Sequence, residues 1–208
     1  MFRWLSLTVV ALSVGSYAQL AKSFTPPTGS PDEVLDKYFK MINDGDLLKQ
    51  DGWKKAAALF VHQSLGPKDD VIFVTTSFPL GNGPMTVKGD QAEADEKWVD
   101  DLGTIDSALR YYPEAKPQFE VEGTIHVFRL VRTEKYWQIL PGGISEKELS
   151  GPPQWRMEGS PTMRWASKDA AIRYVIHLRD KTADPAIKTN ADRTLAKLKR
   201  LPAPRRHI

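Results

Sequence analysis

Four histidines are the first candidates for chemistry in this sequence, because imidazole ligates metals and transfers protons near neutral pH. They are His62, His126, His177 and His207. No two lie at the i, i+4 spacing on one predicted helix and no His-Glu-x-x-His motif occurs, so the usual zinc spacing is missing. The absence of cysteine excludes a disulfide framework, a thiolate metal site and a cysteine nucleophile. The sequence predicts neither a metal nor a cofactor.

Motifs for serine hydrolysis and nucleotide binding are also missing. The sequence has no Gly-x-Ser-x-Gly elbow, no P-loop and no Gly-x-Gly-x-x-Gly after a predicted strand. Gly81-Asn82-Gly83 is too short to cradle a phosphate and is typical of a turn. The acidic stretch from Asp90 to Asp106 lacks the tight glycine-containing loop of a calcium site, so we interpret it as a solvated strand and loop.

Histidine and tryptophan side chains are the candidates for lining a pocket. His126 shares strand parity with Phe128 and Leu130 and could face a cavity, although a hydrogen-bonded histidine of an ordinary strand is the alternative. Most tryptophans should be core, and one or two are candidates to line a pocket for a flat apolar ligand. The tryptophans after residue 18 are Trp53, Trp98, Trp137, Trp155 and Trp165.

The first eighteen residues resemble a secretory signal peptide. Arg3 supplies the positive start, Leu5 to Val14 is an apolar run, and Ser16-Tyr17-Ala18 has small residues where a signal peptidase reads. The run is shorter than the roughly 20 residues that span a bilayer. We therefore expect an exported protein, periplasmic or extracellular, cleaved near Ala18 and joined to its domain by a flexible tether over residues 19–29.

Two helices should open the folded domain. Ser30-Pro31-Asp32-Glu33 combines an N-cap, a proline suited to the first helical position and a capping box. Asn43-Asp44-Gly45-Asp46 should end that helix. A second helix is predicted from about Gly52 to His62, where apolar residues recur at helical spacing.

A run of strands should follow. Period-two and β-branched residues predict strands over 71–77, about 85–99 and 119–132. We predict that the third of these pairs with Tyr136–Leu140 as a hairpin across Thr133-Glu134-Lys135, and that Trp155–Glu158 is a last short strand. Gly151-Pro152-Pro153 is expected to belong to a polar loop.

The C-terminal part should be helical. Ser167 and Asp184-Pro185 each open an amphipathic helix, so helices are predicted within residues 166–200. The basic tail, residues 201–208, should fray, and it is a candidate for weak contact with an anionic surface. The overall net charge of +3 is too small to indicate a nucleic acid partner.

The order of these elements predicts an α+β fold. We expect a curved antiparallel sheet of four to five strands, covered by the two N-terminal helices, in a cone-type domain over residues 30–165 with a C-terminal helical extension.

Two segments resemble nuclear transport factor 2-like domains, the superfamily of the cystatin-like cone. Asn43-Asp44-Gly45-Asp46, followed by Ala56-Ala57-Ala58-Leu59-Phe60, is similar to their opening, and the segment from Phe128 to Ile139 is similar to their closing strands. The resemblance covers roughly residues 30–160 and implies a pocket inside the cone, with Tyr38 as a pocket-facing phenol. No Asp matches the base of the family's ketosteroid isomerases, so no catalytic residue is carried over.

We therefore favour an exported, non-catalytic module that binds a small apolar ligand or a protein partner. Its candidate ligand-binding residues are Tyr38, Phe60, His126 and Trp137. The alternative is an isomerase, cyclase or dehydratase that uses Tyr38 with His126 or with an unidentified carboxylate. Dimerisation of two copies through the open sheet face is a third hypothesis.

Export has a direct consequence for the mature chain. Removal of residues 1–18 should leave a protein that begins at Gln19. Intact-mass measurement of the protein recovered from outside the cytoplasm tests this, and a mass that still includes Met1 to Ala18 would refute cleavage.

Overall fold

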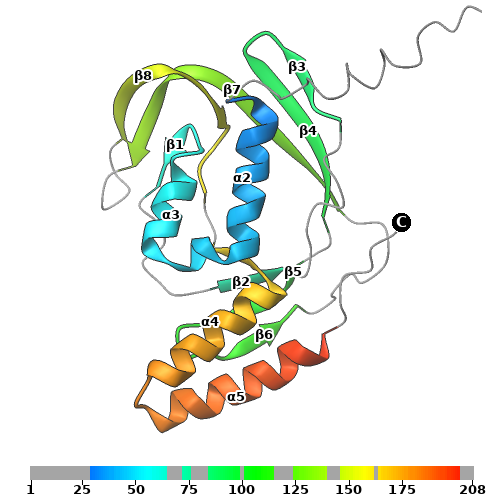
Figure 1. Cartoon of the computed structure of the whole chain (residues 1–208), viewed down its shortest axis with the longest axis vertical. Helices are drawn as coiled ribbons and strands as arrows, with labels where there is room; N and C mark the ends of the chain where they lie inside the picture. The colour runs from blue at the N-terminus through cyan, green and yellow to red at the C-terminus, as the bar shows by residue number, and fades with distance from the viewer. Residues whose placement is uncertain are drawn as a thin grey trace, which may run out of the picture.

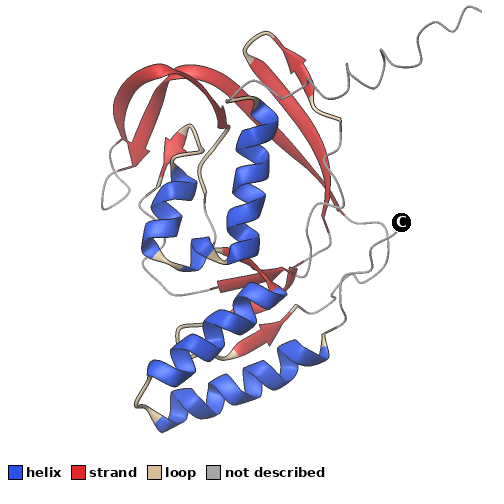
Figure 2. Cartoon of the chain, viewed as in Figure 1, coloured by secondary structure: helices blue, strands red, loops and turns tan. Residues whose placement is uncertain are grey.

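The structure is a computed structural model that describes residues 29–64, 72–75, 84–98, 101–114, 124–139, 146–161 and 164–201. Within these ranges the chain forms four α-helices, one 3-10 helix and nine strands arranged in two sheets (Figure 1 and Figure 2). The predicted α+β class is therefore confirmed. The predicted signal peptide, the tether up to residue 28, the turn at residues 81–83 and the basic tail from residue 202 lie outside the described residues.

Helix α2 (Pro31–Asp44) is fixed at both ends by local chemistry. The hydroxyl of Ser30 accepts a hydrogen bond from the Glu33 backbone N–H at 3.3 Å, and Pro31 occupies the first turn. The helix ends at Gly45, whose φ of 78° lies in the left-handed region that glycine adopts without strain. Its buried side consists of Pro31, Leu35, Tyr38, Phe39, Met41 and Ile42.

Helix α3 (Gln50–Ala57) follows the short 3-10 turn η1 (Asp46–Leu48) and is shorter than the sequence predicts. Residues 59–63 leave the helix because their backbone bonds to strands instead. The Val61 N–H donates to the Met157 carbonyl at 2.9 Å, and the Trp137 N–H donates to the Val61 carbonyl at 2.8 Å. A helical pattern cannot reveal this ending, since the partners lie far along the chain.

The first sheet has five strands, in the order β1-β7-β4-β3 with β8 also paired to β7. The strands are β1 (His62–Gln63), β3 (Thr86–Lys88), β4 (Gln91–Trp98), β7 (Thr124–Ile139) and β8 (Glu146–Met157). All pairs are antiparallel except β1, which runs parallel to β7. The sheet differs from the predicted fully antiparallel one because the segment that leaves α3 adds itself as this strand.

The predicted hairpin across residues 133–135 is wrong. Strand β7 runs through these residues, and its antiparallel partner is β8. The Thr133 hydroxyl accepts from the Lys135 N–H at 3.0 Å, and the pairing register shifts between these two residues. Thr133 pairs with Gln154 and Lys135 pairs with Ser150, so the extra residues of the bulge belong to β8. Gly151-Pro152-Pro153, predicted as loop, forms this bulge within β8 opposite Glu134, and the short strand predicted at Trp155 is the end of β8.

A second sheet, which the sequence analysis did not separate from the first, has four strands in the order β6-β5-β2-β9. They are β2 (Ile72–Thr75), β5 (Asp101–Ile105), β6 (Tyr111–Pro113) and β9 (Trp165–Ser167), and β9 runs parallel to β2. Helices α4 (Lys168–Lys181) and α5 (Pro185–Arg200) pack against it. The C-terminal helices thus share a core with strands from the middle of the chain instead of forming a bare extension.

Two clusters of buried side chains hold these layers together. The first joins α2 and α3 to the first sheet, and its largest members include Tyr38, Trp53, Phe60, Leu130 and Met157. The second joins α4 and α5 to the second sheet, through residues such as Ile72, Ile105, Val175, Leu195 and Leu198. Figure 1 shows the bent pair of β7 and β8 passing over α2 and α3.

The close contact between α3 and η1 requires a glycine at position 52, which has no Cβ. A Cβ at Gly52 would lie 2.0 Å from the Asp46 carbonyl oxygen, which is backbone and cannot step aside. We expect Gly52→Ala to lower the free energy of unfolding by about 2 kcal/mol. Urea denaturation measures this loss.

Gly151→Ala is the matched control, because a Cβ there meets only a ring carbon of Tyr136 at 3.8 Å, an ordinary contact. Equal stability of the two variants would show that the close approach of α3 to Asp46 is not a constraint.

Candidate functional site

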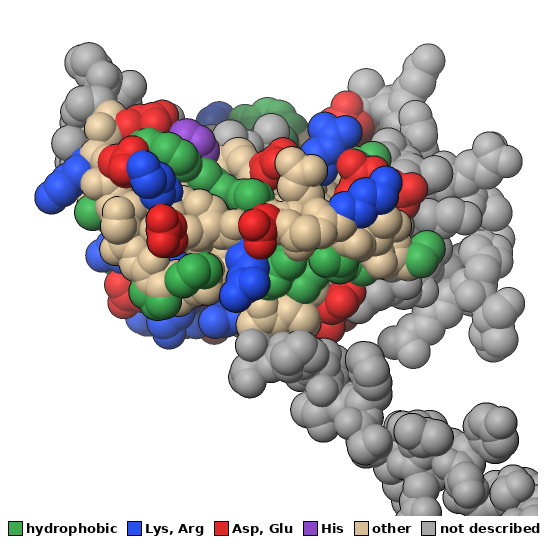
Figure 3. Space-filling model, turned by 90° about the horizontal axis from the view of Figure 1, so that it is seen from above, with side chains coloured by type: hydrophobic (Ala, Val, Ile, Leu, Met, Phe, Trp, Pro, Cys, Tyr) green, Lys and Arg blue, Asp and Glu red, His purple; other side chains and the backbone are tan. Residues whose placement is uncertain are grey.

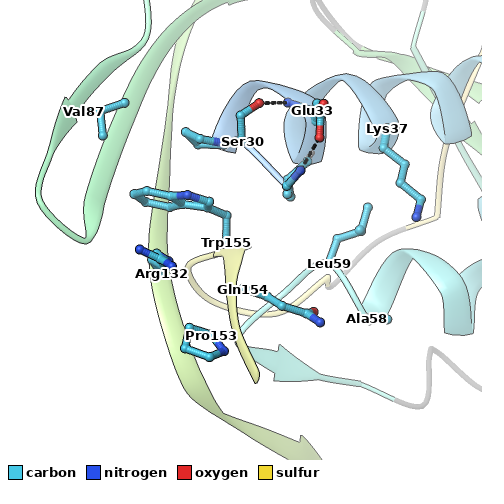
Figure 4. Close-up of a pocket in the computed structure, with 13 residues that line it drawn as sticks. Ser30, Glu33, Lys37, Ala58, Leu59, Val87, Arg132, Pro153, Gln154 and Trp155 are labelled. Atoms are coloured by element: carbon cyan, nitrogen blue, oxygen red, sulfur yellow. Dashed lines mark hydrogen bonds between the residues drawn. The ribbon is translucent and has the colours of Figure 1, made fainter. Parts of the chain in front are cut away.

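A groove of about 820 Å³ lies between the beginning of α2, the segment that leaves α3, and strands β3, β7 and β8 (Figure 4). This volume is within the range of small-molecule sites. Its lining consists of Gly29, Ser30, Pro31, Glu33, Val34, Lys37, Ala58, Leu59, Val87, Arg132, Pro153, Gln154 and Trp155. Seen from above, the surface carries hydrophobic side chains among basic and acidic ones, with no large area of one kind (Figure 3).

The apolar walls of the groove are the outer side of the first core cluster. Val34, Leu59 and Trp155 are half-buried and pack against that cluster while also lining the groove. Val87 on β3 is 51% exposed and closes the groove on another side. A side chain that is supported from behind and open in front presents a fixed apolar surface, which suits a ligand better than a mobile one does.

The Glu33 carboxylate, which lines the groove, accepts a hydrogen bond from within the protein. The Glu33 carboxylate accepts a hydrogen bond from the Gly29 N–H at 2.5 Å, while the Glu33 N–H is bound by the Ser30 hydroxyl (Figure 4). The Ser30 bond is one half of a capping box, and the Glu33 carboxylate reaches one residue further back than the N-cap, to Gly29. The two bonds together hold the first turn of α2 and the residues before it. The one carboxylate that lines the groove therefore serves to position its wall.

Two cations line the groove without a carboxylate partner. Among the residues that the structure describes, neither Lys37 of α2 nor Arg132 of β7 forms an ion pair. Lys40 on the same helix pairs with Asp44, and Arg129 on the same strand pairs with Glu93 at 3.0 Å. The groove thus has apolar walls and a net positive lining, with two cations against one carboxylate.

A buried arginine, Arg156, is hydrogen-bonded to two residues that line the groove. Arg156 is only 7% exposed, donates to the Ala58 carbonyl at 2.6 Å and to the Gln154 side-chain oxygen at 3.2 Å, and stacks 4.2 Å above the Tyr136 ring. Burial lowers the pKa of Arg156, and the nearby Tyr136 opposes this. Because both hydrogen-bond acceptors belong to lining residues, Arg156 ties α3 to β8 at the floor of the groove.

The structure brings together two of the four predicted ligand-binding residues. Tyr38 and Phe60 meet edge to face, with ring centroids 5.3 Å apart, inside the first core cluster. Both are more than nine-tenths buried and neither lines the groove. Burial raises the pKa of the Tyr38 hydroxyl well above its usual range, so this group stays neutral at physiological pH.

The other two predicted residues lie elsewhere. Trp137 stacks on His62, with ring centroids 5.1 Å apart, and the His62 ring nitrogen lies 3.4 Å from a Glu146 oxygen. The backbone of His126 pairs with Glu96 in the β4–β7 ladder, and its side chain lies outside the described part of the structure. The proposed pairing of Tyr38 with His126 therefore stays a prediction.

Among the groove residues, the sequence indicated only Trp155 as a candidate to line a pocket, as one of several tryptophans. The signal it used for the start of α2, the capping box, also marks one wall of the groove, but a cap indicates a helix and not a site. Lys37, Leu59 and Arg132 stand out only once α2, α3 and β7 are placed together.

Within the described ranges, no group of three His, Asp or Glu side chains is placed to hold a metal ion, and no helix is long and apolar enough to cross a membrane. Comparisons of the chain with family models, with curated proteins and with solved structures found no match.

The burial of Tyr38 predicts a pH dependence of stability. Because the pKa of this phenol is higher in the folded chain than in the unfolded one, its contribution is complete below about pH 10 and is lost as the pH rises further. Between pH 9 and pH 11 the wild-type protein should lose about 1 kcal/mol more unfolding free energy than Tyr38→Phe does. Denaturation of both proteins at these two pH values measures the difference, and parallel losses would place the hydroxyl in contact with solvent.

Proposed function

We propose that this protein is a non-catalytic binding module that takes up a small apolar ligand in the groove beside α2. The observation that carries this proposal is the combination of an 820 Å³ cavity with aromatic and aliphatic walls. Trp155 offers a flat ring, and Val34 and Leu59 offer aliphatic surface, each held from behind by the core. Removing such surfaces from water is the main source of affinity for apolar ligands.

A binding role is favoured over the isomerase, cyclase or dehydratase alternative because acid–base chemistry needs titratable groups that reach the substrate. The Tyr38 phenol, the one candidate acid whose position is described, packs among Phe39 and Phe60 and does not line the groove. The Glu33 carboxylate lines the groove but already accepts a hydrogen bond from the Gly29 N–H. The polar groups of the groove are thus better suited to orienting a ligand than to moving protons.

The wider setting of this proposal comes from the sequence. We propose that the chain is exported after loss of residues 1–18, and that residues 30–160 form a cone of the nuclear transport factor 2-like kind. The packing of α2 and α3 against one face of the first sheet supports the second statement. A protein partner, a second copy at the sheet face and an anionic surface for the basic tail are separate hypotheses that this groove does not require.

A pair of valines tests the groove. Val87 and Val127 are similarly exposed, at 51% and 48%, and both lie in strands of the first sheet, but only Val87 lines the groove. We expect Val87→Glu to weaken binding of the neutral fluorophore N-phenyl-1-naphthylamine about fivefold or more, since it places a carboxylate against an apolar ligand. Fluorescence titration measures the affinity.

Val127→Glu should bind the fluorophore as the wild-type protein does. If the two variants lose affinity equally, or if the wild-type protein does not bind the fluorophore, the groove is not the binding site.

A further inference from the structure

We infer that the ligand of this groove carries a carboxylate head group on an apolar chain, and that Arg132 binds that head group. The inference rests on the proposed function, because it names the class of ligand for the same groove. It follows from the charges that line the groove, from the pairing of the cations around it and from the position of Arg132 beside Trp155.

The charged side chains that line the groove are net positive. Its lining includes three charged side chains, Glu33, Lys37 and Arg132, and the Glu33 carboxylate already accepts the Gly29 N–H. The two cations have no ion-pair partner within the described ranges. The Glu33 carboxylate keeps its negative charge, so two cations stand against one carboxylate and the lining is net positive, which favours an anionic ligand over a cationic one.

Other cations on the same two elements, β7 and α2, form ion pairs. On β7, Arg129 pairs with Glu93 and Lys135 pairs with Glu148, whereas Arg132 between them pairs with no carboxylate of the described residues. On α2, Lys40 pairs with Asp44, one turn beyond Lys37. The unpaired members of both elements are the ones that line the groove.

Arg132 is better suited than Lys37 to hold a carboxylate. Its guanidinium can bind both carboxylate oxygens at once, which a lysine ammonium does less specifically. Its backbone is fixed, because the Arg132 N–H donates to the Asp90 carbonyl at 2.8 Å and the residue pairs with Trp155 across β7 and β8. Lys37 lies on the other side of the groove in Figure 4 and adds attraction from a distance.

The geometry also explains why the rest of the ligand is apolar. Trp155 is the cross-strand neighbour of Arg132, Val34 belongs to α2, and Leu59 belongs to the segment that leaves α3. A carboxylate at Arg132 therefore places an attached alkyl chain along an aromatic and aliphatic wall. A medium-chain fatty acid has this combination of a charged end and an apolar body.

Calorimetric titration of the purified protein with decanoate and with decan-1-ol separates the head group from the chain, because the two ligands share an alkyl length. We expect decanoate to bind about tenfold more tightly at neutral pH. In Arg132→Gln most of the preference should be lost, with only the weaker attraction of Lys37 remaining, while the affinity for decan-1-ol stays the same. Arg129→Gln, which removes the same charge from the same strand outside the groove, should keep the preference.

Three results would overturn the inference in distinguishable ways. Equal binding of decanoate and decan-1-ol would remove the carboxylate and leave the proposed function standing. An undiminished preference for decanoate in Arg132→Gln would remove the assignment to Arg132. Binding of neither ligand would overturn the proposed function together with the inference.

Discussion

The attachment of residues 59–63 to the first sheet is the constraint on which the rest of the molecule depends. The Met157 N–H donates to the Leu59 carbonyl at 2.8 Å, the Val61 N–H donates to the Met157 carbonyl at 2.9 Å, and the Val61 carbonyl accepts from Trp137. These bonds end α3 and add β1 to the sheet. They also fix the distance between the helical layer and β8. Leu59 faces the groove because its neighbours are fixed in this way.

The burial of Arg156 beneath the groove is electrostatically unfavourable. Arg156 is buried with two neutral hydrogen-bond acceptors and an aromatic ring around it, and no carboxylate is paired with it among the described residues. Burying a cation without a counter-charge is unfavourable, so we do not count the contacts of Arg156 as a source of stability. Its structural effect is specific, since one side chain joins the end of α3 to β8.

The sequence predicted features that are decided by neighbouring residues. The Ser30 cap and the glycine that ends α2 are local signals, and both are present in the structure. Ser167 likewise opens α4, and Asp184 opens α5. Each depends on bonds within about one helical turn, which a sequence displays directly.

The incorrect predictions share one cause, which is pairing between strands that lie far apart in the sequence. Thr133-Glu134-Lys135 has the composition of a turn, yet β8 holds the chain extended through it and forms a bulge opposite the triplet. The second sheet was missed because its strands are short and one of them, β5, lies in an acidic stretch. The candidate site was misplaced for the same reason. Tyr38 and Phe60 were read as a pocket and instead fill the core, whereas Arg132 and Trp155 become neighbours only through the β7–β8 register.

A crystal structure of the protein grown with decanoate would test the central claim most directly. The account predicts electron density for the alkyl chain between Trp155 and Leu59, with the carboxylate at the guanidinium of Arg132. Density that separates the rings of Tyr38 and Phe60 would contradict it, because the ligand would then occupy the core of the helix and sheet layers and not the groove beside them.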